Sequence, residues 1–67
     1  MNKRMLIANL KCGDQIKDPL RKGAILEVKS VIFRRGQVVL TFMDEDHDSF
    51  VVYKSMTATC TLVASCK

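Results

Sequence analysis

Two apolar runs separated by a tight turn constrain the fold of this chain more than any other feature. In residues 24–35, "AILEVKSVIFRR", apolar and charged side chains alternate from Leu26 to Lys29, which is the period of a strand with one buried face. Residues 37–43, "QVVLTFM", form a second run that is rich in β-branched and aromatic residues. Gly36 lies between the runs, where a positive φ costs glycine little, so the pattern predicts a β-hairpin.

The alternation changes phase at Ser30, because Val31, Ile32 and Phe33 are consecutive apolar residues. A bulge or a sharp bend near Ser30 would change which face of the strand is buried. Strongly curved small barrels need such bends, so we expect one here.

Three further segments complete the pattern. Residues 50–53, "FVVY", and residues 59–65, "TCTLVAS", are expected to be strands, joined by a single 3₁₀ turn in residues 54–58. Residues 4–10, "RMLIANL", predict a first strand or a brief helix. No segment carries the apolar spacing of a helix over three turns, so we expect an all-β protein of about five strands.

The order of these elements resembles the SH3-like small barrels, a group that includes KOW, Tudor and Sm-like domains. The residues that carry the resemblance are "CGDQI", "GAILEVKSVIFRRGQVVLTF" and "FVVYKSMTATCTLV", within residues 5–65. The resemblance implies a small five-stranded SH3-like barrel, a strongly bent antiparallel meander with a long loop after the first strand. We expect that loop to cover residues 11–24, with a strand-like piece around Ile16.

The length of 67 residues allows a single domain, residues 1–67, with a small core. The apolar stretch "MLIANL" is shorter than the apolar region of a signal peptide, and no run approaches the roughly 20 residues of a membrane helix. Three cysteines cannot all pair within the chain. We therefore expect reduced thiols and a cytoplasmic protein that is not attached to a membrane.

Charge is distributed unevenly along the chain. Residues 1–35 contain nine Lys or Arg and three acids, whereas residues 36–67 contain two and four. A basic half of this kind suits a phosphate backbone, because bound cationic side chains displace its counterions. We therefore expect a nucleic-acid-binding surface on the long loop and the 29–35 hairpin, made of Lys17, Arg21, Lys22, Lys29, Arg34 and Arg35.

Two aromatic residues flank the same hairpin. Phe33 and Phe42 could pair across it, and aromatic platforms accompany the binding of single-stranded nucleic acid. Packing in the core is the commoner use of phenylalanine, so these residues add little to the hypothesis.

The acidic cluster at residues 44–48, "DEDHD", copies the first ligand positions of a calcium loop. Ser49 and Ser55 replace the glycine and the glutamate that complete such a loop, so we expect a solvated turn, without metal or other cofactor. His47 has no second ligand at a metal-binding spacing and is expected to be an exposed loop residue. A chain this short seldom forms a water-excluding cleft, so we expect no enzyme and no catalytic residues.

Two functions stay open. The first is a small regulatory or accessory module that binds DNA or RNA through basic loops and the hairpin. The alternative is a protein–protein interaction module, an adaptor or inhibitor, whose charged turns meet a protein partner or a second copy of the chain. The two charged turns should lie at opposite ends of strand 37–43, roughly 20 Å apart. This distance would keep the acids away from a phosphate bound at the turn with Arg34 and Arg35, which we call the arginine tip.

Overall fold

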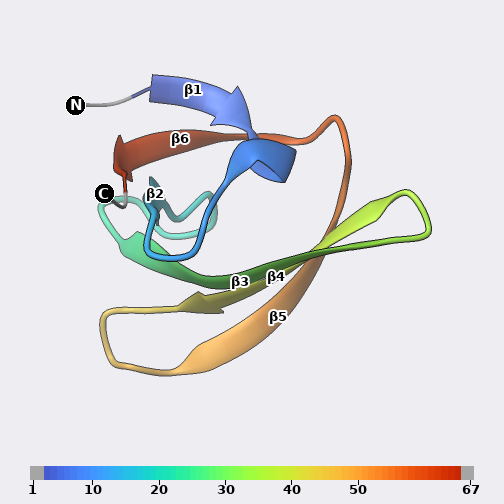
Figure 1. Cartoon of the computed structure of the whole chain (residues 1–67). Helices are drawn as coiled ribbons and strands as arrows, with labels where there is room; N and C mark the ends of the chain where they lie inside the picture. Colours follow the sequence, from blue (N-terminus) through green and yellow to red (C-terminus); the bar gives the residue numbers. More distant parts are fainter. Residues whose placement is uncertain (1–2, 66–67) are drawn as a thin grey trace.

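In a computed structural model of the chain, residues 3–65 are described and form an all-β structure (Figure 1). Its elements are β1 (Lys3–Leu6), the 3₁₀ helix η1 (Ile7–Asn9), β2 (Gln15–Lys17), β3 (Ile25–Arg34), β4 (Gln37–Met43), β5 (Ser49–Ser55) and β6 (Thr59–Ala64). Within these described residues, no helix has the length and apolar composition needed to cross a lipid bilayer.

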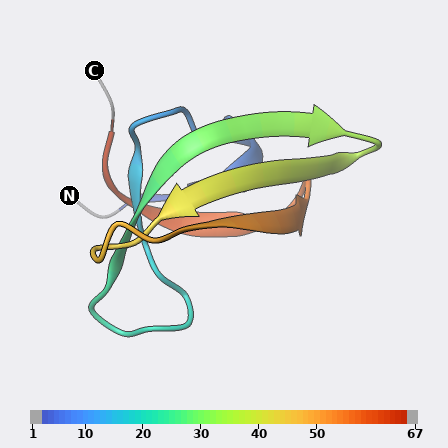
Figure 2. The same cartoon turned by 90° about the horizontal axis from the view of Figure 1, so that it is seen from below.

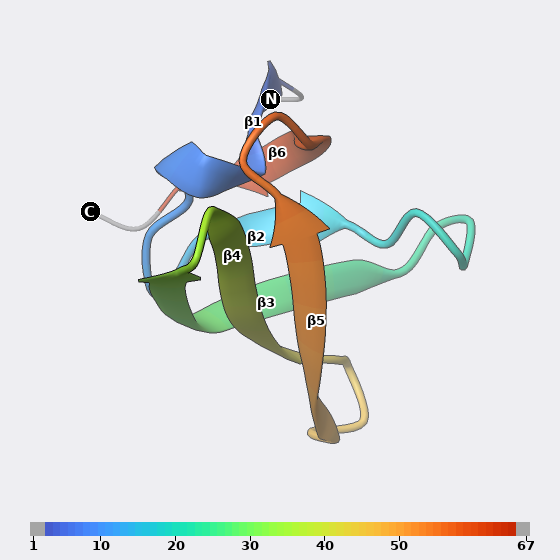
Figure 3. The same cartoon turned by 90° about the vertical axis from the view of Figure 1, so that its right-hand side faces the viewer.

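The six strands form one antiparallel sheet in the order β1-β6-β2-β3-β4-β5. The sheet bends strongly, so that β5 runs across the direction of β2 (Figure 3). The prediction of an all-β antiparallel protein is confirmed. The five-stranded barrel is not confirmed, because the sheet has a sixth strand and stays open between its edge strands β1 and β5. The additional strand is β2, at the strand-like piece that we expected around Ile16.

The predicted bulge in β3 is confirmed. The register between β3 and β4 shifts between Val28 and Ser30, which leaves Lys29 as the extra residue. Before the bulge Val28 faces the core, and after it Val31 lies opposite the buried Leu40. Because of the extra residue, Val28 and Val31 lie on the same face although they are three positions apart, and Ile32 lies on the outer face.

The predicted hairpin between β3 and β4 is also confirmed. Arg34 pairs with Gln37, so only Arg35 and Gly36 form the loop. Their φ angles are 49° and 77°, and positive φ at both central positions is the mark of a type I′ turn, whose twist matches that of the flanking strands.

The core lies on the inner face of the bent sheet. Phe42 faces Phe50 across β4 and β5, with ring centroids 6.0 Å apart. Phe33 pairs instead with Val38, so the expected contact between Phe33 and Phe42 is wrong. The buried apolar residues of the core are Ile7, Leu10, Ile16, Leu26, Val28, Val38, Leu40 and Phe42.

Asp14 organises the turn that leads into β2. Its side chain is buried, and its carboxylate accepts the backbone N–H of Lys11 at 2.9 Å. Its carbonyl accepts the N–H of Val28 at 2.8 Å, and the N–H of Gly13 donates to the carbonyl of Val28 at 2.8 Å. These bonds attach the turn to β3 beside the bulge.

Two local predictions are met only in part. Residues 4–10 contain both alternatives, a strand and then η1, rather than one of them. The turn expected in residues 54–58 is shorter than predicted, because β5 extends to Ser55; a single i→i+3 bond follows, donated by the N–H of Ala58 to the carbonyl of Ser55 at 3.1 Å. The carbonyl of Ala58 accepts the N–H of Ile7 at 2.8 Å, which joins this turn to η1.

Candidate functional site

The strands β3, β4 and β5 present a face that points away from the core. We call it the outer face, and strand register arranges its side chains in rows across the three strands. Ile32 and Tyr53 in this face are 54% and 63% exposed, and they lie in the same row on either side of Val39 rather than as isolated side chains. From the hairpin end inward, the rows are Arg34, Gln37 and Ser55; Ile32, Val39 and Tyr53; and Ser30, Thr41 and Val51.

An open hollow of about 340 Å³ lies at the hairpin end of the outer face, and we call it the arginine hollow. Its lining combines two guanidinium groups, an amide, an apolar floor and a phenol ring. Guanidinium groups bind phosphate oxygens through paired N–H donors, and an exposed aromatic ring offers a stacking surface. The lining residues are Arg34, Arg35, Gln37, Val39 and Tyr53.

In strands β3, β4 and β5, no acidic residue lies near the hairpin end. Strands β4 and β5 contain no Asp or Glu, and the one acid of β3 is Glu27, near the opposite end of that strand. Neither Arg34 nor Arg35 forms an ion pair with a carboxylate of residues 3–65. Lys54 is exposed at the same end of β5, but it lies opposite the buried Val38, on the inner face, and does not line the arginine hollow.

The acidic loop of residues 44–48 follows the other end of β4, as predicted (Figure 1). The seven residues of β4 span roughly 20 Å at 3.3 Å per residue. This separation is about two Debye lengths at physiological ionic strength, so the acids weaken an anion site at the hairpin only slightly.

The structure does not bring the six predicted site residues together. Lys17 ends β2, and Arg21 and Lys22 lie in the loop that precedes β3, whereas the arginine tip follows β3 (Figure 2). The ten residues of β3 separate the two groups. Two consecutive connections must lie at opposite ends of the strand between them, so this separation could have been inferred from the sequence.

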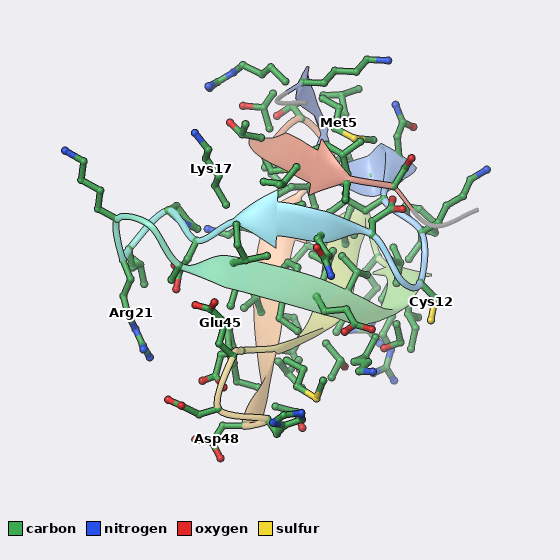
Figure 4. All side chains as sticks on the ribbon, turned by 90° about the vertical axis from the view of Figure 1, so that its left-hand side faces the viewer. Met5, Cys12, Lys17, Arg21, Glu45 and Asp48 are labelled. Atoms are coloured by element: carbon green, nitrogen blue, oxygen red, sulfur yellow. The ribbon has the colours of Figure 1, made fainter. Side chains whose placement is uncertain are left out.

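The loop cations share their end of the molecule with the acidic loop. Glu27 pairs with Met43, so the loop before β3 and the loop after β4 leave the sheet at the same end. Figure 4 shows Arg21 on the same side of the molecule as Glu45 and Asp48. The opposite charges offset one another there, which makes this end a weaker site for a polyanion than the hairpin end.

Lys29 occupies an intermediate position. It is the extra residue of the β3 bulge, and its Nζ atom lies 3.1 Å from Oε2 of Glu27. Exposed ion pairs of this kind contribute only about 0–1 kcal/mol, so Lys29 remains available to a ligand. It does not line the arginine hollow.

The acidic loop uses its own carboxylate to hold its shape. Oδ1 of Asp44 accepts the backbone N–H groups of Asp46 at 2.9 Å and of Asp48 at 3.0 Å. His47 closes the turn with φ at 65°, and its N–H donates to the carbonyl of Asp44 at 3.1 Å. Among the described residues, no three His, Cys, Asp or Glu side chains are grouped to hold a metal ion.

The two thiols of residues 3–65 lie apart from His47. Cys12 is exposed and Cys60 is half-buried in β6, whereas His47 lines a second open hollow, beside the acidic loop, to which neither thiol contributes. Burial raises the pKa of the Cys60 thiol, against an opposing effect of Arg4, so the reactive thiolate is disfavoured. Cys66 lies outside the described residues.

Sequence reasoning missed Tyr53, Gln37 and Val39 as parts of the site. A signal for them was present, because a two-residue turn fixes the pairing of β3 with β4. The position of Tyr53 then depends on the pairing of β4 with β5 through the longer acidic loop.

Comparisons of this chain with protein-family models, with curated proteins and with solved structures found no match.

Proposed function

We propose that this protein is a small non-enzymatic module that binds single-stranded nucleic acid at the hairpin end of its sheet. One observation carries the proposal: Arg34, Arg35 and Tyr53 line the same open hollow, at the end of β3, β4 and β5 where these strands carry no acid. The guanidinium groups would bind backbone phosphates, and the Tyr53 ring would stack on a base. Single-stranded DNA and RNA both offer these groups.

The small number of cations and aromatic rings at the site limits the affinity for nucleic acid that we expect. Arg34 and Arg35 can neutralise about two phosphates, which gives a slope of about −1.4 in log K against log salt for a single strand. Stacking of one base on Tyr53 adds about 1–3 kcal/mol. Binding should therefore be weak and strongly dependent on salt, as suits an accessory module.

Fluorescence anisotropy with labelled oligo-dT and oligo-U, titrated at several salt concentrations, tests the site. The variant Arg34→Gln/Arg35→Asn removes the tip charges, and Arg21→Gln/Lys22→Gln removes the same net charge from the opposite end. We expect the tip variant to lose about 1.4 from the salt slope, and the loop variant to lose much less. Tyr53→Leu should weaken binding without changing the slope.

Two results would contradict this proposal. Absence of binding to either polymer at low salt would remove the nucleic-acid function. A larger loss of the salt slope in the loop variant than in the tip variant would place the site on Lys17, Arg21 and Lys22 instead.

The second candidate is a protein partner that docks on the outer face. The observation in its favour is the apolar row in which the exposed Ile32 and Tyr53 flank the half-buried Val39, since exposed apolar patches mark protein contacts. The variant Ile32→Lys separates the two candidates. It adds a cation beside the arginine hollow and should strengthen oligonucleotide binding, whereas it should disrupt an apolar protein contact.

We keep the SH3-like class and a cytoplasmic location as parts of the proposal. The bulged β3 and the meander from β3 to β5 support the SH3-like class, although the sheet is open. The odd number of cysteines supports a reducing compartment.

A further inference from the structure

The two edges of the sheet are protected to very different degrees. β1 has only four residues, and two of them are the cations Lys3 and Arg4. Short edge strands with charged side chains are a common means of preventing edge-to-edge pairing. β5 has seven residues and a single charge, Lys54. Figure 1 shows β5 as the last strand of the sheet, and no other segment of residues 3–65 lies beyond it. A long, largely apolar edge strand offers a row of unpaired N–H and C=O groups, which is a template for pairing with another strand.

Backbone geometry identifies the groups that β5 offers at this edge. The N–H of Asp44 donates to the carbonyl of Asp48 at 3.0 Å, which fixes the alternation of hydrogen-bonded pairs between β4 and β5. Two residues further along each strand, Phe42 and Phe50 form the next such pair, and the alternation continues to Val52 and Lys54. The intervening residues of β5 therefore point their N–H and C=O groups to the open edge: Ser49, Val51, Tyr53 and Ser55.

We propose that β5 pairs antiparallel with β5 of a second copy of this chain, about a two-fold axis at Val52. In this register Val51 of each copy lies opposite Tyr53 of the other, and their outward backbone groups form a hydrogen-bonded pair. Outer-face residues of one copy then lie opposite outer-face residues of the other, so the row of Ile32, Val39 and Tyr53 gains an apolar contact with Val51 of the second copy. Phe50 lies opposite Lys54 on the inner face, and no like charges face each other.

The charges at the two ends of β5 favour a second copy of the chain as the partner, and they favour antiparallel over parallel pairing. The acidic loop precedes β5, and the arginine tip lies at the end of the sheet where β5 finishes. Antiparallel pairing brings the acids of one copy towards the tip cations of the other, with Lys54 nearest to Asp48 of the second copy. Parallel pairing would place acids beside acids. The dimer does not depend on the proposed function, although Tyr53 belongs to both surfaces.

Sedimentation equilibrium, from micromolar to near-millimolar protein at low salt, tests the dimer. Two variants test the register with the same loss of apolar side chains. Val51→Lys/Tyr53→Lys places two lysines opposite two lysines, whereas Val51→Lys/Tyr53→Glu places each lysine opposite a glutamate. We expect two-chain mass for the wild type and the Lys/Glu variant, and one-chain mass for the Lys/Lys variant. Circular dichroism should show the same strand content in all three.

Three results would overturn the proposal. The first is a wild type of one-chain mass at every concentration. The second is equal mass for the two variants, and the third is a wild type that grows beyond two chains without a plateau. If the variants lose strand content, Val51→Pro replaces them, because its missing N–H faces the open edge and leaves the pairing with β4 intact. The Val51→Pro protein should then have one-chain mass and Val51→Thr two-chain mass, and equal masses would overturn the proposal.

Discussion

Oδ1 of Asp44 accepts the backbone N–H of Asp48 at 3.0 Å, so the acidic loop is held by one of its own carboxylates. The same oxygen accepts the N–H of Asp46 at 2.9 Å. The loop therefore contains one structural acid among several solvated ones. This division also explains why a motif that resembles part of a calcium loop serves here as the connection between β4 and β5.

Removal of the structural acid should destabilise the hairpin. Asp44→Ala leaves two backbone N–H groups without their acceptor, and we expect a loss of about 1–2 kcal/mol in the free energy of unfolding. Glu45→Ala removes a charge from the same loop without removing a hydrogen bond of the turn, so it should change stability by less than about 0.5 kcal/mol. Urea denaturation measures both. Equal effects of the two variants would show that the Asp44 bonds are not formed in solution.

The type I′ turn predicts that substitutions at its two adjacent residues, Arg35 and Gly36, change the free energy of unfolding in opposite directions. Arg35 has φ at 49°, a conformation that asparagine tolerates better, so Arg35→Asn should stabilise the protein by about 0.5–1 kcal/mol. A Cβ atom at Gly36 would meet nothing within 4 Å, but its φ of 77° disfavours alanine. Gly36→Ala should therefore cost about 1 kcal/mol through backbone strain alone. Thermal unfolding would contradict the turn type if both variants were neutral.

Two leucines allow a matched test of the core. Leu40 is 0% exposed and Leu20 is 93% exposed. Leu40→Ala should lose about 2–5 kcal/mol, a large part of the roughly 3–10 kcal/mol expected for a chain of this size. Leu20→Ala should change stability by less than about 0.5 kcal/mol. A measurable loss for Leu20→Ala in urea denaturation would mean that the loop before β3 packs against the body or against a second copy.

The raised pKa of Cys60 predicts a loss of stability at alkaline pH. Burial raises this pKa, Arg4 lowers it and Asp14 raises it further. The thiol therefore stays protonated in the folded state at pH values where it ionises in the unfolded state. Its contribution to the free energy of unfolding is complete below the ordinary pKa of about 8.5. This contribution is lost as the pH rises through the raised pKa of the folded state.

Urea denaturation of the wild type and of Cys60→Ala between pH 7 and 10, under reducing conditions, isolates this contribution. Because other groups titrate equally in both proteins, the difference in stability between them should shrink as the pH rises. A constant difference would contradict the burial of the thiol.

Local sequence features predicted a large part of the fold. The bulge near Ser30, the loop at Gly36 and the bounds of β4 all depend on neighbouring residues, whose alternation and turn chemistry can be followed along the chain. The turn after β5 is shorter than the predicted residues 54–58, because residues 54 and 55 extend β5 in its pairing with β4. That extension comes from the partner strand and not from the segment itself.

The sequence by itself determined an antiparallel meander with an arginine tip and an acidic loop at opposite ends of one strand. Strand period and turn geometry impose that arrangement over a few residues. Only the tertiary structure decided that the sheet stays open at β5, because closure depends on where two distant edge strands meet. It also decided that Tyr53 lies beside Arg34 and Arg35 while Arg21 lies near the acids, since cross-strand register sets the neighbours of a side chain.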